Sequence, residues 1–337
     1  MKHVARLAAL ALAPAFATPA LGQANEVIEQ FPRYDRVEGV TGSIKSIGSD
    51  TMNNLMTLWS EGFRHMYSNV MPEIEGKGSS TAPPALISGT AQFGPMSRPM
   101  KSKEIDDFEK EYGYKPTALR TAIDMLGVYV HKDNPIQSLT LQQVDAIFSK
   151  TRKGGHPDDI RTWGDVGLTG EWANKPISLY GRNSASGTYG YFQDNALFKG
   201  DFKASVKEQP GSSAVVQAVA NDKYAIGYSG IGYKTEDVRA VALAHAGVPA
   251  VEATPENAYG GEYPLARFLY VYVNYKPGSK LDPLRREFLR YVYSRQGQSD
   301  VIKDGYYPVT GDIAKNDLRS VGLDLKLTEA SAPRENN

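Results

Sequence analysis

Residues 43–74 carry the pattern that decides the fold: SIKSIGSDTMNNLMTLWSEGFRHMYSNVMPEI. The two ends of this stretch, Ser43–Ile47 and Val70–Ile74, are short runs typical of strands. Apolar side chains recur between them at helical spacing and predict a helix over Met52–Tyr67: Leu55, Leu58, Trp59, Phe63 and Met66. A strand, a helix and a strand in this order predict a parallel sheet with right-handed crossovers.

Similar alternation of short apolar runs continues along the chain. These runs are Leu126–His131, Leu141–Phe148, Ile177–Tyr180, Val215–Val219, Ala225–Tyr228 and Leu265–Val273. A chain of 337 residues is long enough for about two domains of roughly 150 residues each. The sequence therefore predicts an α/β protein with two domains and without an internal repeat.

The composition excludes several classes of protein. The 38 basic and 38 acidic residues give a formal net charge of zero, so we expect no nucleic-acid partner. Hydrophobic residues at 41% and charged residues at 23% predict a packed core. Without cysteine, the chain has no disulfide, no thiolate metal site, no cysteine nucleophile and no lipid-bearing cysteine.

The N-terminus predicts export from the cytoplasm. Lys2 and Arg6 precede an apolar run, Leu7–Phe16, that leads into small residues, so residues 1–24 are predicted to be a signal peptide cut near Gly22 or Ala24. A buried N-terminal helix is the alternative. No later apolar run reaches the roughly 18 residues of a membrane span, so we expect a soluble protein. The polar tail, residues 328–337, is predicted to be disordered.

Four segments rich in Gly, Ser and Thr follow predicted strands: GSDT at 48–51, GKGSST at 76–81, GPMSR at 94–98 and GRNSASGTYG at 181–190. A helix N-terminus presents unpaired N–H groups that attract anions, although each segment alone is also explained as a cap or a turn. The second segment lacks the spacing of a nucleotide-binding P-loop.

The fourth segment is the most specific. Arg182 offers a permanently charged donor fork, Ser186 and Thr188 add hydroxyls, and Gly187 permits close approach of the backbone. This set suits a tetrahedral oxyanion, whereas a solvated surface arginine is the alternative.

The chain resembles periplasmic phosphate-binding proteins, the PstS-type substrate-binding proteins of phosphate ABC transporters. The similarity extends from about Ser43 to Val309 and includes, in the family's order, the motifs GSDT, GKGSST, QFGPMSRP, GRNSASGTYGYF, AIGY and YPLAR. The resemblance implies a two-lobed periplasmic-binding-protein fold (type II), in which each lobe is a mixed, mostly parallel sheet flanked by helices and the ligand lies in the interlobe cleft. Lobe one would combine residues 38–124 and 265–322, and lobe two would comprise residues 125–264.

The resemblance also implies a function. The protein would be a monomeric periplasmic receptor that binds inorganic phosphate and docks transiently on a membrane-embedded ABC permease, with no cofactor, no metal and no catalysis. Its phosphate-binding residues would be Ser49, Asp50, Thr51, the N–H of Met52, Ser79, Ser80, Ser97, Arg182, Ser186, Gly187 and Thr188.

Two departures from the family affect selectivity. The family often has aspartates at the positions of Ser97 and Ser184, where they accept the proton of phosphate and brace the arginine, respectively. Asp50 is the nearest substitute acceptor, or else it caps a helix start. Selectivity for phosphate over sulfate, arsenate or molybdate therefore does not follow from the resemblance.

The alternatives are a receptor for another oxyanion such as sulfate or molybdate, a secreted phosphate scavenger, or a secreted hydrolase. Ser229 lies in GYSGI, which lacks the final glycine of a nucleophile elbow. The segment His156-Pro157-Asp158-Asp159 would hold a metal or form a solvated loop.

Overall fold

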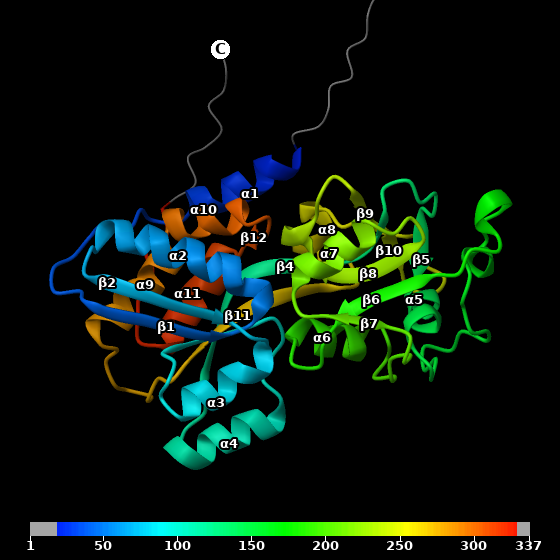
Figure 1. Cartoon of the computed structure of the whole chain (residues 1–337). Helices are drawn as coiled ribbons and strands as arrows, with labels where there is room; N and C mark the ends of the chain where they lie inside the picture. Colours follow the sequence, from blue (N-terminus) through cyan, green and yellow to red (C-terminus); the bar gives the residue numbers. More distant parts are fainter. Residues whose placement is uncertain (1–18, 329–337) are drawn as a thin grey trace, which may run out of the picture.

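The structure is a computed structural model that describes residues 19–328. The chain forms two α/β lobes that lie side by side (Figure 1). The first lobe contains α1 (Pro19–Glu29), β1 (Gly42–Gly48), η1 (Asp50–Met52), α2 (Asn53–Met66), β2 (Val70–Gly76), η2 (Ser79–Thr81), α3 (Ala82–Ile87), β3 (Phe93–Met96), α4 (Ser102–Tyr112), β11 (Ala266–Val273), α9 (Pro283–Val292), α10 (Arg295–Lys303), β12 (Tyr307–Pro308) and α11 (Gly311–Ser320). The two-lobed α/β fold is confirmed.

The second lobe is built from the middle of the chain. It contains β5 (Ser138–Thr140), α5 (Leu141–Phe148), η3 (Trp163–Val166), η4 (Gly170–Trp172), β6 (Ser178–Arg182), α6 (Gly187–Asn195), β7 (Lys207–Gln209), α7 (Ser212–Ala220), β8 (Ala225–Gly230), η5 (Ile231–Tyr233), β9 (Val238–Ala240), β10 (Ala242–Ala244) and α8 (Pro255–Tyr259). The predicted helix over Met52–Tyr67 corresponds to α2, and the two predicted strands beside it are β1 and β2.

One strand, β4 (Thr117–His131), belongs to both lobes. Its first part pairs antiparallel with β11 up to Met125, and from Leu126 onward it pairs antiparallel with β8. The main path through the sheet runs β2-β1-β3-β11-β4-β8-β6-β7. The sheet is therefore mixed, because parallel strands at both ends of this path flank antiparallel strands in its middle.

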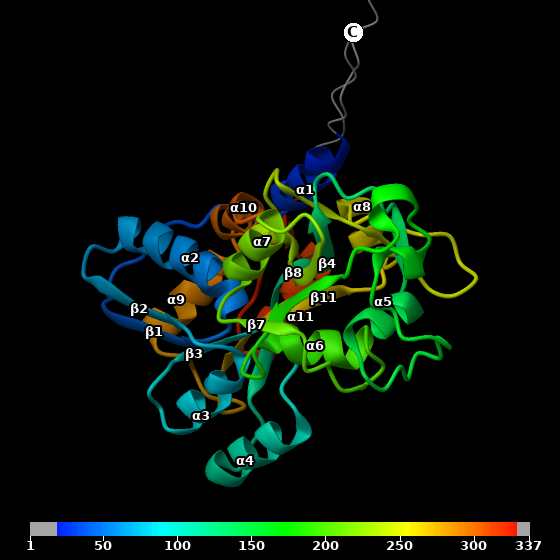
Figure 2. The same cartoon turned by 45° about the vertical axis from the view of Figure 1, so that its right-hand side comes forward.

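The core extends through both lobes. A single cluster of buried apolar side chains includes Trp59 and Phe288 on the lobe-one side and Phe192 and Tyr228 on the lobe-two side. The rings of Phe192 and Tyr228 stack with centroids 3.8 Å apart. Figure 2, turned by 45°, shows α3 and α4 projecting together below the rest of lobe one. The core is therefore continuous across the boundary between the lobes.

Parts of the predicted leader and tail lie outside the described residues. Residues 1–18 of the predicted signal peptide are not described, and α1 runs through the predicted cleavage region. Thr328, the first residue of the predicted tail, donates from its N–H to the carbonyl of Gln30 and from its hydroxyl to that of Glu29. The rest of the predicted tail, 329–337, lies beyond the description. Within residues 19–328, no helix has the length and apolarity needed to cross a membrane.

Candidate functional site

Three loops of lobe one each carry a serine, and the hydroxyls of these serines lie close together. Ser49 follows β1, Ser79 follows β2 and Ser97 follows β3, and these strands are parallel. Because the carboxyl ends of parallel strands lie at the same edge of a sheet, the three side chains converge. The Ser97 Oγ lies 3.0 Å from the Ser49 Oγ and 3.3 Å from the Ser79 Oγ, and all three residues are buried. This triad of hydroxyls is the lobe-one side of the candidate site.

Lobe two contributes the start of α6. Ser186 is its N-cap and accepts hydrogen bonds from the N–H groups of Thr188 and Tyr189. A Cβ on Gly187 would lie 2.2 Å from the Ser79 Oγ and 2.6 Å from the Ser97 Oγ, so glycine permits α6 to touch the serine triad. The N-terminus of α6, with its partial positive charge, therefore faces the lobe-one hydroxyls directly.

Hydrogen bonds join the two lobes at this site. The hydroxyls of Thr51 and Thr188 lie 2.9 Å apart. The Ser80 hydroxyl and N–H both donate to the carbonyl of Ala185, at 3.1 and 3.2 Å. The cleft is thus closed in this structure, with backbone and side chains of both lobes in direct contact.

Arg182 is the buried cation of the site. It ends β6, is 1% exposed, and donates from Nη1 to the Ser212 Oγ at 2.6 Å. Its Nε has no hydrogen-bond partner among the residues that the structure describes. Burial lowers the pKa of Arg182, while the charge of Asp50 opposes this shift. An unpaired donor on a buried cation favours an anion as its partner.

Asp50 has a partner that the sequence did not indicate. Its carboxylate accepts the N–H of Ser212, the first residue of α7, at 2.9 Å, and lies 3.2 Å from the Nη1 of Arg182. The carboxylate therefore caps a helix of the opposite lobe rather than its own helix start. It also braces Arg182, while Ser184, at the position of the family's bracing aspartate, is exposed.

Two predicted residues are held by local contacts. The N–H of Met52 donates to the carbonyl of Ser49 at 3.2 Å within the turn of η1. The side chain of Met52 is fully buried in the core. The structure thus brings together Ser49, Thr51, Ser79, Ser97, Arg182, Gly187 and Thr188, while Asp50, Met52, Ser80 and Ser186 surround them and are engaged with neighbouring groups.

Sequence reasoning missed two charged residues and one serine. Arg267 on β11 and Asp124 on β4 form a buried ion pair of 2.7 Å, and Arg267 also donates to the Thr188 hydroxyl at 2.9 Å. Ser212 links Asp50 to Arg182. A signal existed for Arg267, which is a single charge inside the apolar strand β11, because a buried charge requires a partner.

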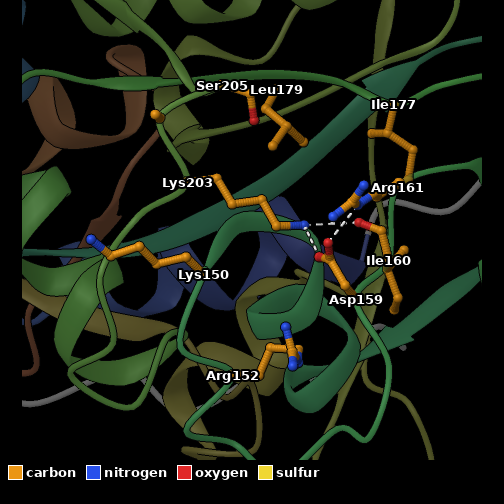
Figure 3. Close-up of a pocket in the computed structure, with 10 residues that line it drawn as sticks. Lys150, Arg152, Asp159, Ile160, Arg161, Ile177, Leu179, Lys203 and Ser205 are labelled. Carbon is orange, nitrogen blue, oxygen red and sulfur yellow. Dashed lines mark hydrogen bonds and ion pairs between the residues drawn. The ribbon is translucent and has the colours of Figure 1, made fainter.

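A basic pocket in lobe two differs from this site. It has a volume of about 700 Å³ and is lined by Lys150, Arg152, Arg161 and Lys203 around Asp159 (Figure 3). Asp159 pairs with Lys203 at 2.6 Å and with Arg161 at 2.5 Å. A neighbouring pocket shares Lys150 and Lys203 and extends to Arg182. At the centre of the first pocket, Lys203 and Arg161 thus share one carboxylate, whereas the Nε of Arg182 has no partner among the described residues.

The alternative metal segment forms a turn. The Nδ1 of His156 lies 2.9 Å from the carbonyl oxygen of Asp158 and 3.3 Å from its N–H nitrogen. Over residues 19–328, no group of three or more His, Cys, Asp or Glu side chains is arranged to hold a metal ion.

Comparisons with known proteins agree with this arrangement. The family model of the PBP superfamily domain matches residues 35–296. The phosphate-binding protein PstS of Pseudomonas aeruginosa is 53% identical over 322 residues, which cover 94% of this chain and 100% of that protein. The chain belongs to the PstS family. The phosphate-binding protein PstS of Staphylococcus saprophyticus is 28% identical over 264 residues, 77% of this chain and 78% of that protein.

Solved structures of similar fold include proteins described as phosphate transport receptors. A putative phosphate ABC transporter substrate-binding protein from Clostridium perfringens, crystallised with bound phosphate, has a TM-score of 0.68 and 26% identity, covering 80% of this chain and 100% of that chain. An ABC-type phosphate transport receptor from Vibrio cholerae, with a TM-score of 0.61 and 20% identity, covers 80% of this chain and 100% of its own and supports the fold. The resemblance inferred from the motifs is confirmed, and the family is one of transport receptors rather than enzymes.

Proposed function

We propose that the protein is an extracytoplasmic receptor that binds inorganic phosphate between its lobes and delivers it to an ABC-type permease. The observation that carries this proposal is the Nε of Arg182, a buried donor with no partner in the described part of the chain. The Nη1 of the same side chain donates to the Ser212 hydroxyl, which lies 3.5 Å from the hydroxyl of Thr51 in lobe one. Membership of the PstS family supports phosphate as the anion. No chemical step is required, so we propose that the protein is not an enzyme.

The proposed phosphate ligands are the groups that converge on one region. Arg182 supplies charge, and the hydroxyls of Ser49, Ser79 and Ser97 face the N-terminus of α6 across the cleft. Hydroxyls both donate and accept, so they suit a tetrahedral anion that still carries a proton. Thr51, Ser186, Gly187, Thr188 and the surrounding Asp50, Met52 and Ser80 complete the proposed set.

The lobes are proposed to move as rigid bodies about the two places where the chain crosses between them. These crossings lie near Met125 in β4 and just before Ala266, where β11 begins. We retain the boundaries of 38–124 with 265–322 and of 125–264 as the proposed lobes. Closure would bury the anion and form a surface for a permease, with the receptor acting as a monomer in the periplasm after removal of residues 1–24.

Calorimetric titration tests the proposal. Desalted mature protein is titrated at neutral pH with phosphate, sulfate, arsenate and molybdate. We expect saturable binding of phosphate at one site per chain. Tighter binding of sulfate or molybdate would show that phosphate is not the preferred ligand. Release of phosphate from a phosphate ester by the purified protein would favour a hydrolase.

A further inference from the structure

Arg267 occupies the junction of the two lobes. It lies on β11 directly opposite Asp124 on β4 in the strand register. Its Nε and Nη2 donate to one oxygen of Asp124, at 2.9 and 2.7 Å, and the other oxygen of Asp124 accepts the N–H of Ile231 in lobe two at 2.9 Å. Both side chains are almost completely buried. The pair is therefore held firmly where the chain crosses between the lobes.

The other N–H groups of Arg267 contact residues of the anion site. Nη1 donates to the carbonyl of Ser97 in lobe one at 2.8 Å. Nη2 donates to the hydroxyl of Thr188 in lobe two at 2.9 Å. One guanidinium thus contacts the candidate site on both sides of the cleft.

The contact with Arg267 occupies one acceptor position of the Thr188 hydroxyl. An arginine has no acceptor, so the oxygen of Thr188 must accept from Arg267. A hydroxyl has a single proton, and that of Thr188 is then available to Thr51, 2.9 Å away, or to an anion between them. The same argument applies to Ser212, whose oxygen accepts from Arg182. Each arginine therefore occupies one acceptor position of a neighbouring hydroxyl and leaves its proton free for another partner.

The two arginines also act on one another. Burial lowers the pKa of Arg182, and the positive charge of Arg267 lowers it further. Asp50 and Asp124 each offset one of these charges from outside the hydroxyl cluster. A negative charge placed between the two guanidinium groups relieves their mutual repulsion.

We propose that Arg267 is a positioning residue of the anion site: held by Asp124, it occupies one acceptor position of the Thr188 hydroxyl, orients that hydroxyl so that its proton is available to the bound anion, and fixes Ser97 in place. This role rests on the proposed function, because it belongs to the same site. It places a second guanidinium group, paired with Asp124, next to the site without requiring direct contact between Arg267 and the anion.

The test removes the pair while preserving the charge balance. The Asp124→Asn/Arg267→Gln variant is compared with Arg120→Gln/Asp317→Asn, which removes another arginine–aspartate pair of 2.6 Å that also involves β4. Calorimetry with inorganic phosphate is expected to show at least about tenfold weaker binding for the first variant and a change below about twofold for the control. Unchanged affinity in the first variant overturns the positioning role.

A double-mutant cycle separates positioning from general damage to the fold. Thr188→Val and Arg267→Lys are made singly and together, and Arg267→Lys keeps a positive charge beside Asp124 should the double variant fail to fold. We expect each single change to weaken phosphate binding several-fold and the combination to weaken it by clearly less than the product. Effects that multiply fully overturn the proposed route through Thr188.

The wild-type titration distinguishes the two proposals. Wild-type protein that fails to bind phosphate overturns the proposed function and the role of Arg267 with it. Wild-type protein that binds phosphate, together with variants that bind equally well, overturns the role of Arg267 alone.

Discussion

Two arginine–aspartate pairs lie at the junction of the lobes, and they differ in what they connect. Arg182 belongs to lobe two and Asp50 to lobe one, so their 3.2 Å contact crosses the cleft. Arg267 and Asp124 lie on neighbouring strands of one sheet. The Asp50 side chain is 25% exposed, whereas that of Asp124 is fully buried. In the proposed hinge motion, opening of the cleft would separate the first pair, while the second pair would persist in both states.

The two arginine–aspartate pairs are therefore expected to have different roles. A pair across a moving boundary contributes to the balance between open and closed forms, because it exists in one of them. A buried pair within a sheet is present in every state, and removing one of its partners leaves an uncompensated charge that destabilises the fold. Substitutions at the first pair should therefore change binding, and those at the second should also change unfolding.

Arg267→Ala is expected to give the largest effect, on stability. It leaves the carboxylate of Asp124 buried without its cation, which costs about 3–5 kcal/mol in the free energy of unfolding. Urea denaturation followed by circular dichroism measures this loss. A loss below about 1 kcal/mol would mean that Asp124 finds water or another donor. The two arginine–aspartate pairs would then not differ in their effect on unfolding.

Arg182→Ala is expected to affect binding most while leaving the fold intact. Loss of a buried, hydrogen-bonded cation opposite an anion costs about 2–5 kcal/mol, or roughly 30-fold to several thousand-fold in phosphate affinity. Calorimetry on the folded variant measures the change. A loss of less than about threefold would place the anion elsewhere.

Asp50→Asn is expected to have a smaller effect that is common to all anions. The asparagine oxygen still accepts the N–H of Ser212, and a partly exposed ion pair is worth under about 1 kcal/mol, so affinities should move by about fivefold at most. The ratio of phosphate to sulfate dissociation constants at neutral pH should stay constant. If the ratio narrows clearly, Asp50 accepts the proton of phosphate.

Asp304→Asn tests burial near the second pair. Burial raises the pKa of Asp304 to about 7, a hydrogen bond with Asn54 opposes this, and the charge of Asp124 adds to it. The folded state then keeps a proton that the unfolded chain releases near pH 4, so stability falls as pH rises from about 4 to about 7.

After allowance for partial exposure of Asp304, that fall should be about 1–2 kcal/mol, and Asp304→Asn should flatten it. Urea denaturation at pH 5 and pH 8 for both proteins measures the slope. Equal slopes would show that Asp304 is well solvated and that the charge of Asp124 does not reach it.

Local pattern was sufficient for much of the fold and part of the site. The period of residues 43–74 predicted β1, α2 and β2 because strand and helix spacing are properties of short segments. The composition of residues 181–190 indicated Arg182 and the start of α6 for the same reason. Whether these residues bind phosphate remains a prediction.

The roles of Asp50 and Arg267 depend on distant pairing. Asp50 meets Ser212 across 162 positions of sequence, and Arg267 meets Asp124 across 143. No local rule specifies such partners, since they follow from the order of strands in the sheet. The family resemblance showed that Ser97 and Ser184 stand where relatives often have aspartates. It did not indicate that the carboxylate beside Arg182 would be that of Asp50, from the other lobe.

The position of β11 in the sequence affects how the protein folds during and after synthesis. β11 lies between β3 and β4 in the sheet, although these two strands precede it by more than a hundred residues. During synthesis, lobe one lacks its central strand until this late segment leaves the ribosome, and closing so long a loop slows folding. In the proposed export, the chain would pass through a translocation channel before it folds. The late position of β11 in the sequence would delay completion of the lobe-one sheet and so favour that passage.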